Sequence, residues 1–304
     1  MLRLAIIVLG ILWAAAVPAD AKPFAEMFPQ KTYDNKDVQT FLEALDYKQG
    51  AVPLSSINIT FEVPDGYYFL GAEDAKRILV ELWGNPAGAA NGVLGMIFSA
   101  AATPFDETWG AVVTFDNDGF VTDENADEID YAELLREMQS DTDAANPARK
   151  EQGFEPVTLI GWASRPFYER ESHKLHWAKE LRFGTTTPHT LNYNVRVLGR
   201  HGVLNINFIS EVDKLTTIRN SIPAVMDMPK FNEGARYADY IPGTDKLAAY
   251  GIGGLIAGKV LSKAGILAVL LVFLKKGWIV IVLALGGIWT LAKRFFLNRS
   301  GPAD

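Results

Sequence analysis

Apolar and polar residues alternate at a period of two through the segment between Lys174 and Ser210. Alternation of this kind is typical of half-buried antiparallel strands, in which every second side chain faces the core. It predicts strands over residues 174–183, 190–198 and 203–210. The tetrapeptide Gly199-Arg200-His201-Gly202 predicts a tight turn between the last two. We therefore expect a three-stranded β-meander.

The apolar positions also predict how these strands pair. Matching the apolar faces of the last two strands places Val197 opposite Leu204. The same argument for the first two strands places Trp177 opposite Val195 and Leu181 opposite Leu191. Register matters because a shift by one residue moves every side chain of a strand to the other face.

Further elements surround this meander. Ala75, Ile78, Leu79, Leu82 and Trp83 have the spacing of one face of an amphipathic helix. We also expect strands over 58–63, 67–70, 109–115 and 157–162, a helix reaching toward Arg149, a helix after Asp213 that breaks at Pro223, a loop around 93–98 and a linker over 231–243. The fold class predicted is α+β, with an antiparallel sheet covered by helices on one face.

The N-terminal residues have the pattern of an export signal. Arg3 precedes an uncharged apolar run over 4–16, and Ala19-Asp20-Ala21 fits the small-x-small cleavage rule. We expect a signal peptide over residues 1–21, with an uncleaved N-terminal anchor as the alternative. In either case the soluble domain expected over residues 22–245 is exported. It has either one core or two subdomains divided near residue 150.

Residues 246–304 are predicted to be a membrane anchor. Residues 277–292 carry no charge and would extend roughly 24 Å as a helix, with Lys or Arg on both sides. The preceding segment contains Lys259 and Lys263 on one helix face, so it is either an interfacial helix or the first span of a hairpin. Gly254 and Gly258 form a GxxxG pattern that would allow close helix packing or self-association.

Composition excludes several classes of function. The formal net charge of the 304 residues is −7, which argues against a nucleic-acid partner. The chain has no cysteine, so disulfides, thiol catalysis and thiolate metal sites are excluded. No HExxH, GxSxG, SxxK, Walker or dinucleotide-binding pattern is present, and we expect no cofactor.

A calcium site is one candidate for the chemistry. If Gly119 is the central glycine of a calcium loop, Asp116 and Asp118 occupy positions three and five. Thr114 and Asn125 then stand where two further ligands are needed, so a tight turn is the alternative. A hydrolase using carboxylates with His176 or His189 is another hypothesis, although no motif singles out a catalytic pair.

The back of the meander is the candidate binding surface. On the predicted register, one face collects His176, Glu180, Arg182, Asn192, Asn194, Arg196, Asn205 and Asn207. Amide and guanidinium groups in such numbers can bind a polar ligand or partner. The alternative interpretation is the solvent-facing side of a sheet covered on one face.

Long stretches of the chain resemble an uncharacterised bacterial family of membrane-anchored proteins with a domain of unknown function. The likeness is carried by LIGWASRPFYERESHKLHWAKEL, HTLNYNVRVLGRHGVLNIN and FNEGARYADYIPGTDKLAAYG, together with PDGYYFLGAEDAKRILVELWGN and TFDNDGFVTDENADEIDYAELL. The resemblance implies an exported domain held by a C-terminal anchor, and it implies no activity.

These observations together predict a binding or interaction component of the cell envelope. Its α+β domain is expected in the periplasm, tethered to the cytoplasmic membrane. Its partners are expected to be membrane lipid and a membrane protein or a second copy. A carboxylate- and histidine-dependent hydrolase and a calcium sensor are the alternatives.

Overall fold

The computed structural model describes residues 20–124 and 126–258. The chain separates into two compact units, residues 1–252 and residues 253–304. The β-sheet lies in the first unit. Most of the predicted signal peptide lies outside the described residues, as do the apolar run 277–292 and both Lys259 and Lys263. Among the residues that are described, no helix is long and apolar enough to cross a membrane.

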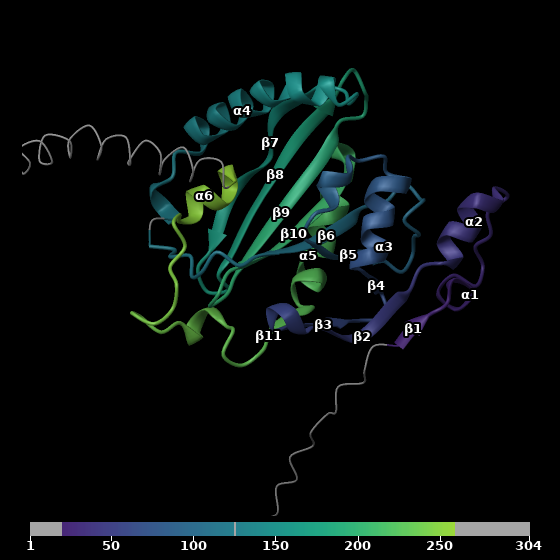
Figure 1. The fold of residues 1–304 in the computed structure, drawn as a ribbon, viewed down its shortest axis with the longest axis horizontal. Coiled ribbons are helices and arrows are strands. Elements are labelled where there is room, and N and C mark those ends of the chain that lie inside the picture. The colour runs from purple at the N-terminus through teal and green to yellow at the C-terminus, as the bar shows by residue number, and fades with distance from the viewer. Residues whose placement is uncertain (1–19, 125, 259–304) are drawn as a thin grey trace, which may run out of the picture. The chain divides into compact units, whose positions relative to one another are not determined.

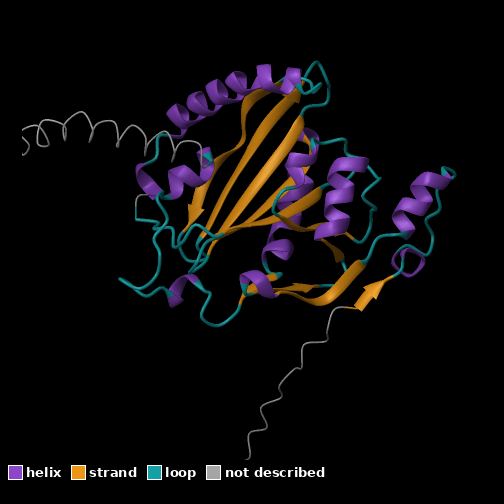
Figure 2. Ribbon diagram, viewed as in Figure 1, coloured by secondary structure: helices purple, strands orange, loops and turns teal. Residues whose placement is uncertain are grey.

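An antiparallel sheet forms the centre of the first unit (Figures 1 and 2). The described part of the chain contributes eleven strands, in the order β11-β3-β2-β4-β5-β6-β10-β9-β8-β7, with β1 paired to β2. Their bounds are β1 Asp20–Lys22, β2 Tyr47–Leu54, β3 Ile59–Val63, β4 Tyr67–Gly71, β5 Val93–Ser99, β6 Gly110–Asp116, β7 Val157–Glu169, β8 Lys174–Phe183, β9 Thr190–Leu198, β10 Val203–Glu211 and β11 Pro229–Phe231. The β6–β10 pair joins strands from before and after residue 150. The predicted antiparallel α+β class is therefore confirmed.

Helices accompany this sheet on both faces. Their bounds are α1 Phe24–Met27, α2 Lys36–Glu43, α3 Ala72–Arg77 with a following π-helical turn Ile78–Leu82, α4 Tyr131–Glu151 and α5 Leu215–Met226. A further helix, α6 Ile252–Ala257, belongs to the second unit except for its first residue. Asn35 and Asp130 cap α2 and α4 by accepting hydrogen bonds from the first free backbone N–H groups. The helix predicted to reach Arg149 and the one predicted from Ala75 are both present.

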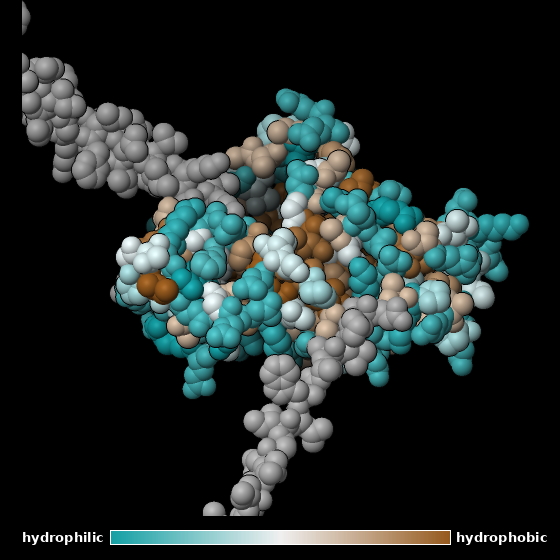
Figure 3. Space-filling model, turned by 60° about the horizontal axis from the view of Figure 1, so that its bottom comes forward, coloured by the Kyte–Doolittle hydropathy of each residue, from teal (hydrophilic) through white to brown (hydrophobic). Residues whose placement is uncertain are grey.

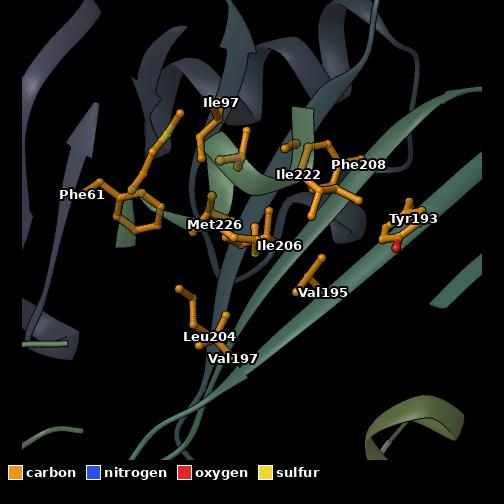
Figure 4. Close-up of a cluster of buried hydrophobic side chains, with 14 of the residues drawn as sticks. Phe61, Ile97, Tyr193, Val195, Val197, Leu204, Ile206, Phe208, Ile222 and Met226 are labelled. Carbon is orange, nitrogen blue, oxygen red and sulfur yellow. The ribbon is translucent and has the colours of Figure 1, made fainter. Parts of the chain in front are cut away.

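One face of the sheet packs against α5. Ile218, Ile222 and Val225 of α5 are buried with Val195 of β9 and Ile206 of β10 in one apolar cluster. Figure 4 shows Ile222 of the helix and Val195 and Ile206 of the sheet within this cluster. We call this the α5 face.

The opposite face carries a second apolar cluster. Ala75, Ile78 and Leu79 are buried there with Val112 of β6, whose neighbour Val113 belongs to the α5 face. At the other end of the sheet α4 lies along β7, and Gln139 donates to the carbonyl of Leu159. Helices on both faces replace the one-sided cover predicted from the sequence. Figure 3 shows one side of the molecule, with mostly hydrophilic residues and apolar ones near the middle.

The register of the meander is right for one pair of strands and wrong for the other. Val197 pairs with Leu204 as predicted. Trp177, however, pairs with Asn194 instead of Val195, one residue away from the prediction. The prediction assumed that one face of the sheet was apolar and the other wet. Because helices accompany both faces, Trp177 can be buried on the sheet face that points away from α5. The smaller Ala178 lies on the α5 face, in the apolar cluster there.

Two other local predictions, for residues 93–98 and for Pro223, are corrected by the structure. Residues 93–99 form strand β5 and not a loop, because they pair with β4 and β6. Helix α5 continues through Pro223 without a break. Proline removes one hydrogen bond only three residues before the end of this helix, where Ile222 and Val225 are buried.

The passage 231–243 is not a bare linker. It begins in β11 and includes a short 3-10 turn over Tyr237–Asp239. Just beyond it, Asp245 forms a bidentate ion pair with Arg200 from the β9–β10 turn, with N–O distances of 2.8 and 2.9 Å. Such paired hydrogen bonds fix direction as well as distance. They hold the chain that follows β11 to the end of the meander.

Candidate functional site

The site is built on the sheet face opposite α5, where β8, β9 and β10 lie side by side. Arg196 pairs with Asn205 and Asn194 with Asn207, as the sequence predicts, and Asn192 follows along β9. The corrected register adds Lys179, which lies opposite Asn192. We call Lys179, Asn192, Asn194, Arg196, Asn205 and Asn207 the polar floor.

His176 does not belong to the polar floor, contrary to the prediction, and neither do Glu180 and Arg182. The one-residue shift of β8 places all three on the α5 face, with His176 opposite Val195. There its ring stacks on Phe167 with 4.8 Å between centroids and an interplanar angle of 3°. Burial lowers the pKa of His176 to about 4, and it is opposed by the carboxylate of Glu169, which lies 3.7 Å from Nε2. At neutral pH this histidine is an uncharged packing group.

The polar floor is buried or half-buried, and it is incompletely hydrogen-bonded within the described chain. Asn194 and Asn205 are each only 5% exposed. Asn194 donates to the carbonyl of Asn192, and Asn205 donates to Thr114. Arg196 Nη1, Asn205 Oδ1 and Asn207 Oδ1 are buried without a partner, as is the neighbouring Trp177 Nε1. A buried polar atom left unpaired costs about 1–3 kcal/mol, so this arrangement is not explained by stability.

Two cations give the floor a positive character. Burial first, and the nearby Arg196 second, lower the pKa of Lys179 to about 8. Burial likewise lowers the pKa of Arg196 to about 10, partly opposed by Asp116. The Arg196 guanidinium lies 5.0 Å from the centre of the Trp177 indole ring, a cation–π geometry. Among the described residues neither cation has a carboxylate within 4.0 Å.

A cavity of about 500 Å³ opens at one end of this floor. Asn192 belongs to both, because it lines the cavity and lies opposite Lys179. The apolar part of the wall comes from Trp83, Phe154, Phe183 and Ile209. The charged part comes from Asp106, Glu107, Glu155, Glu211, Arg149 and Lys214. Sequence reasoning missed this cavity, because its walls come from segments more than 100 residues apart.

The hydrolase hypothesis finds no catalytic pair in this cavity. None of the described histidines lines it. His189 instead pairs with Glu180, and His173 lies 3.5 Å from Asp123 and stacks on Tyr237. These contacts hold turns together at the two ends of the meander.

The calcium candidates are also engaged by protein groups. Tyr250 donates to Asp118 with an O–O distance of 2.7 Å. Asp116 lies at the end of β6 and acts electrostatically on Arg196. Within the part of the chain that the structure describes, no group of three or more metal-ligating side chains occurs.

The predicted GxxxG pair does not lie within one continuous helix. Gly254 is inside α6, which ends at Ala257, and Gly258 has a φ of +84°. Its N–H donates to the Gly254 carbonyl. A residue with left-handed φ commonly ends a helix, and glycine adopts it at little cost.

Comparison with known proteins places the chain in a family. No curated protein matches it. Among solved structures, it is similar to the PsbP protein CyanoP from Synechocystis sp. PCC 6803, at 12% identity and a TM-score of 0.34, with 67% of this chain and 99% of that chain covered. A family model described as "Protein of unknown function (DUF2167)" matches residues 46–286. The chain therefore belongs to the DUF2167 family of proteins of unknown function.

Proposed function

We propose that this chain is a cell-envelope protein whose α+β domain binds a ligand or partner at the polar floor and its cavity. One observation carries the proposal. Polar atoms of Trp177, Arg196, Asn205 and Asn207 are buried on one sheet face without partners in the described chain. Proteins tolerate such a cost at functional sites, where a bound molecule completes the hydrogen bonds.

Site-specific photo-crosslinking in cells tests this binding function. A benzophenone amino acid replaces Asn192, which lines the cavity, and a control replaces Arg182, which is exposed on the other face of β8. We expect a covalent adduct at position 192, seen as a mass increase on a protein or small molecule, and none at position 182. Equal adducts at both positions, or none at either, contradict the proposal.

The location proposed for this domain is the periplasm, with residues 246–304 as the anchor in the cytoplasmic membrane and lipid as one partner. The support is the sequence: an export-type N-terminus, and the uncharged run 277–292 between basic residues. Carbonate extraction of membranes should leave the full chain in the pellet, and protease added to spheroplasts should digest its domain. Release by carbonate, or protection from protease, contradicts this location.

A further inference from the structure

We infer that the polar floor recognises an anionic group, a carboxylate or phosphate, on a ligand whose apolar body occupies the adjoining cavity. The inference rests on the proposed function and adds the chemical class of the ligand. It draws on three observations: the free hydrogen-bond donors, the balance of charge, and the position of the floor beside the cavity.

The free groups on the floor are suited to an anion. Arg196 Nη1 and Trp177 Nε1 are N–H donors without a partner, and neither can act as an acceptor. The ammonium group of Lys179 adds further donors on the same face. The side-chain amide of Asn207 can turn to present its NH₂ group as well as its oxygen. Oxygen atoms of a carboxylate or phosphate accept from all of these groups.

The charge balance points the same way. Lys179 and Arg196 share a poorly hydrated face, and Arg196 is close enough to lower the pKa of Lys179. No described carboxylate lies within ion-pair distance of either group. Asp116 acts on Arg196 from the far end of the floor, beyond ion-pair distance. An anion placed between the two cations relieves their repulsion and replaces lost hydration.

The floor adjoins the cavity at Asn192, the floor residue that lines its wall. Lys179 pairs with Asn192 of the cavity wall, and Trp177 lies two residues farther along β8. Arg196 starts farther from the cavity, but its guanidinium leans over the Trp177 ring. Lys179 therefore lies beside the cavity wall, and Arg196 lies four residues from Asn192 along β9.

The cavity itself orients such a ligand. Its apolar wall can cover an aromatic or aliphatic body, and about 500 Å³ is an ordinary size for a small-molecule site. The remainder of the wall carries four carboxylates, of Asp106, Glu107, Glu155 and Glu211, and two cations, Arg149 and Lys214. The excess of negative charge disfavours an anion there and favours one beside Lys179 and Arg196.

Isothermal titration calorimetry on the purified full chain at pH 7 tests the inference. The probes are 2-naphthoate, its uncharged analogue 2-naphthamide, and 2-naphthyl phosphate. We expect one or both anions to bind at least about 10-fold more tightly than the amide, a difference of about 1.4 kcal/mol. The stronger anion identifies the preferred head group as carboxylate or phosphate.

Matched variants locate the effect. Arg196→Gln and Lys179→Gln should each lower the affinity for the anion by about 10-fold or more. The affinity for the amide should change little. Arg182→Gln and Lys174→Gln remove the same charges from the α5 face of β8 and should change neither affinity. Circular dichroism melting confirms that each variant is folded, and the wild-type probe comparison does not depend on any variant.

Two results would overturn the inference. Equal affinity for anion and amide, or equal losses in the control variants, would show that the floor does not recognise charge, while binding at the cavity would still stand. Absence of heat with all three probes at millimolar concentration would also reject it. Photo-crosslinking at position 192 then decides separately whether the proposed binding function fails as well.

Discussion

The guanidinium of Arg196 lies 5.0 Å from the centre of the indole ring of Trp177, on the adjacent strand. This stack holds the guanidinium group over the ring. The indole N–H of Trp177 has no hydrogen-bond partner among the described residues. Since Trp177 is 1% exposed, the ring offers a rigid surface for the guanidinium. Arg196 thereby comes close enough to influence Lys179 two residues along β8.

The first prediction concerns the pKa of Lys179, which is lowered to about 8. Removing the neighbouring charge with Arg196→Gln should raise this pKa, but not to its ordinary 10.5, because burial is the larger cause. Competitive labelling of amines as a function of pH, read by mass spectrometry, measures it. Arg182→Gln is the control and should leave the pKa near 8. An unchanged pKa in Arg196→Gln would mean that the two cations do not interact.

The second prediction separates function from stability at Asn207. Its Oδ1 is buried without a partner, so Asn207→Leu should raise the free energy of unfolding by about 0.5–2 kcal/mol while weakening anion binding. Asn194→Leu is the comparison, because it removes a hydrogen bond to the Asn192 carbonyl and should destabilise the fold. Urea unfolding of both variants provides the measurement. A destabilised Asn207→Leu would assign this amide a structural role.

The third prediction is a pH dependence due to His176. Its pKa is about 4 in the folded chain against 6.5 ordinarily, so below pH 6.5 the unfolded chain binds the proton more readily. Stability contributed by the neutral ring is complete above pH 6.5 and is lost as pH falls toward 4. This loss amounts to about 2 kcal/mol at pH 5.

The volume-matched variant His176→Phe should abolish that loss. Phenylalanine keeps the stack on Phe167 and removes two buried nitrogens without partners. Its stability advantage over the wild type should therefore grow between pH 7 and pH 5, as followed by urea unfolding at each pH. A constant difference across this range would show that His176 does not titrate with folding.

The fourth prediction tests the close approach between the backbone of Gly202, just before β10, and the backbone of Asp116 at the end of β6. A Cβ added at Gly202 would lie 2.0 Å from the carbonyl oxygen of Asp116, where backbone must move. Gly202→Ala should therefore destabilise the fold, on the order of 2–4 kcal/mol. Gly161→Ala in β7 meets nothing within 4 Å and should have little effect. Similar melting temperatures for the two variants would argue against the close approach at Gly202.

Much of the meander was predictable because its information is local. Tyr193, Val195 and Val197 alternate with polar residues, and the four-residue turn after Leu198 leaves few ways to pair β9 with β10. That pairing alone brings together the five polar-floor residues predicted from the sequence. Caps such as Asp130 before α4 are local in the same sense.

The register of β8 was not predictable from the same pattern. Between β8 and β9 the loop is longer, and both Trp177 and Ala178 are apolar, so either can face the core. Packing on both faces of the sheet decides between them. The result moves His176 off the polar floor and brings Lys179 onto it.

The sequence by itself determined the antiparallel strands, the α+β class and the shared face of Asn192, Asn194, Arg196, Asn205 and Asn207, because side-chain periodicity and short turns are local properties. Only the tertiary structure decided that this face is largely withdrawn from solvent, that Arg196 leans over Trp177, and that a cavity opens beside Asn192. The cavity depends on Trp83, Phe154 and Ile209, which are distant in the chain and meet only when their apolar surfaces pack together.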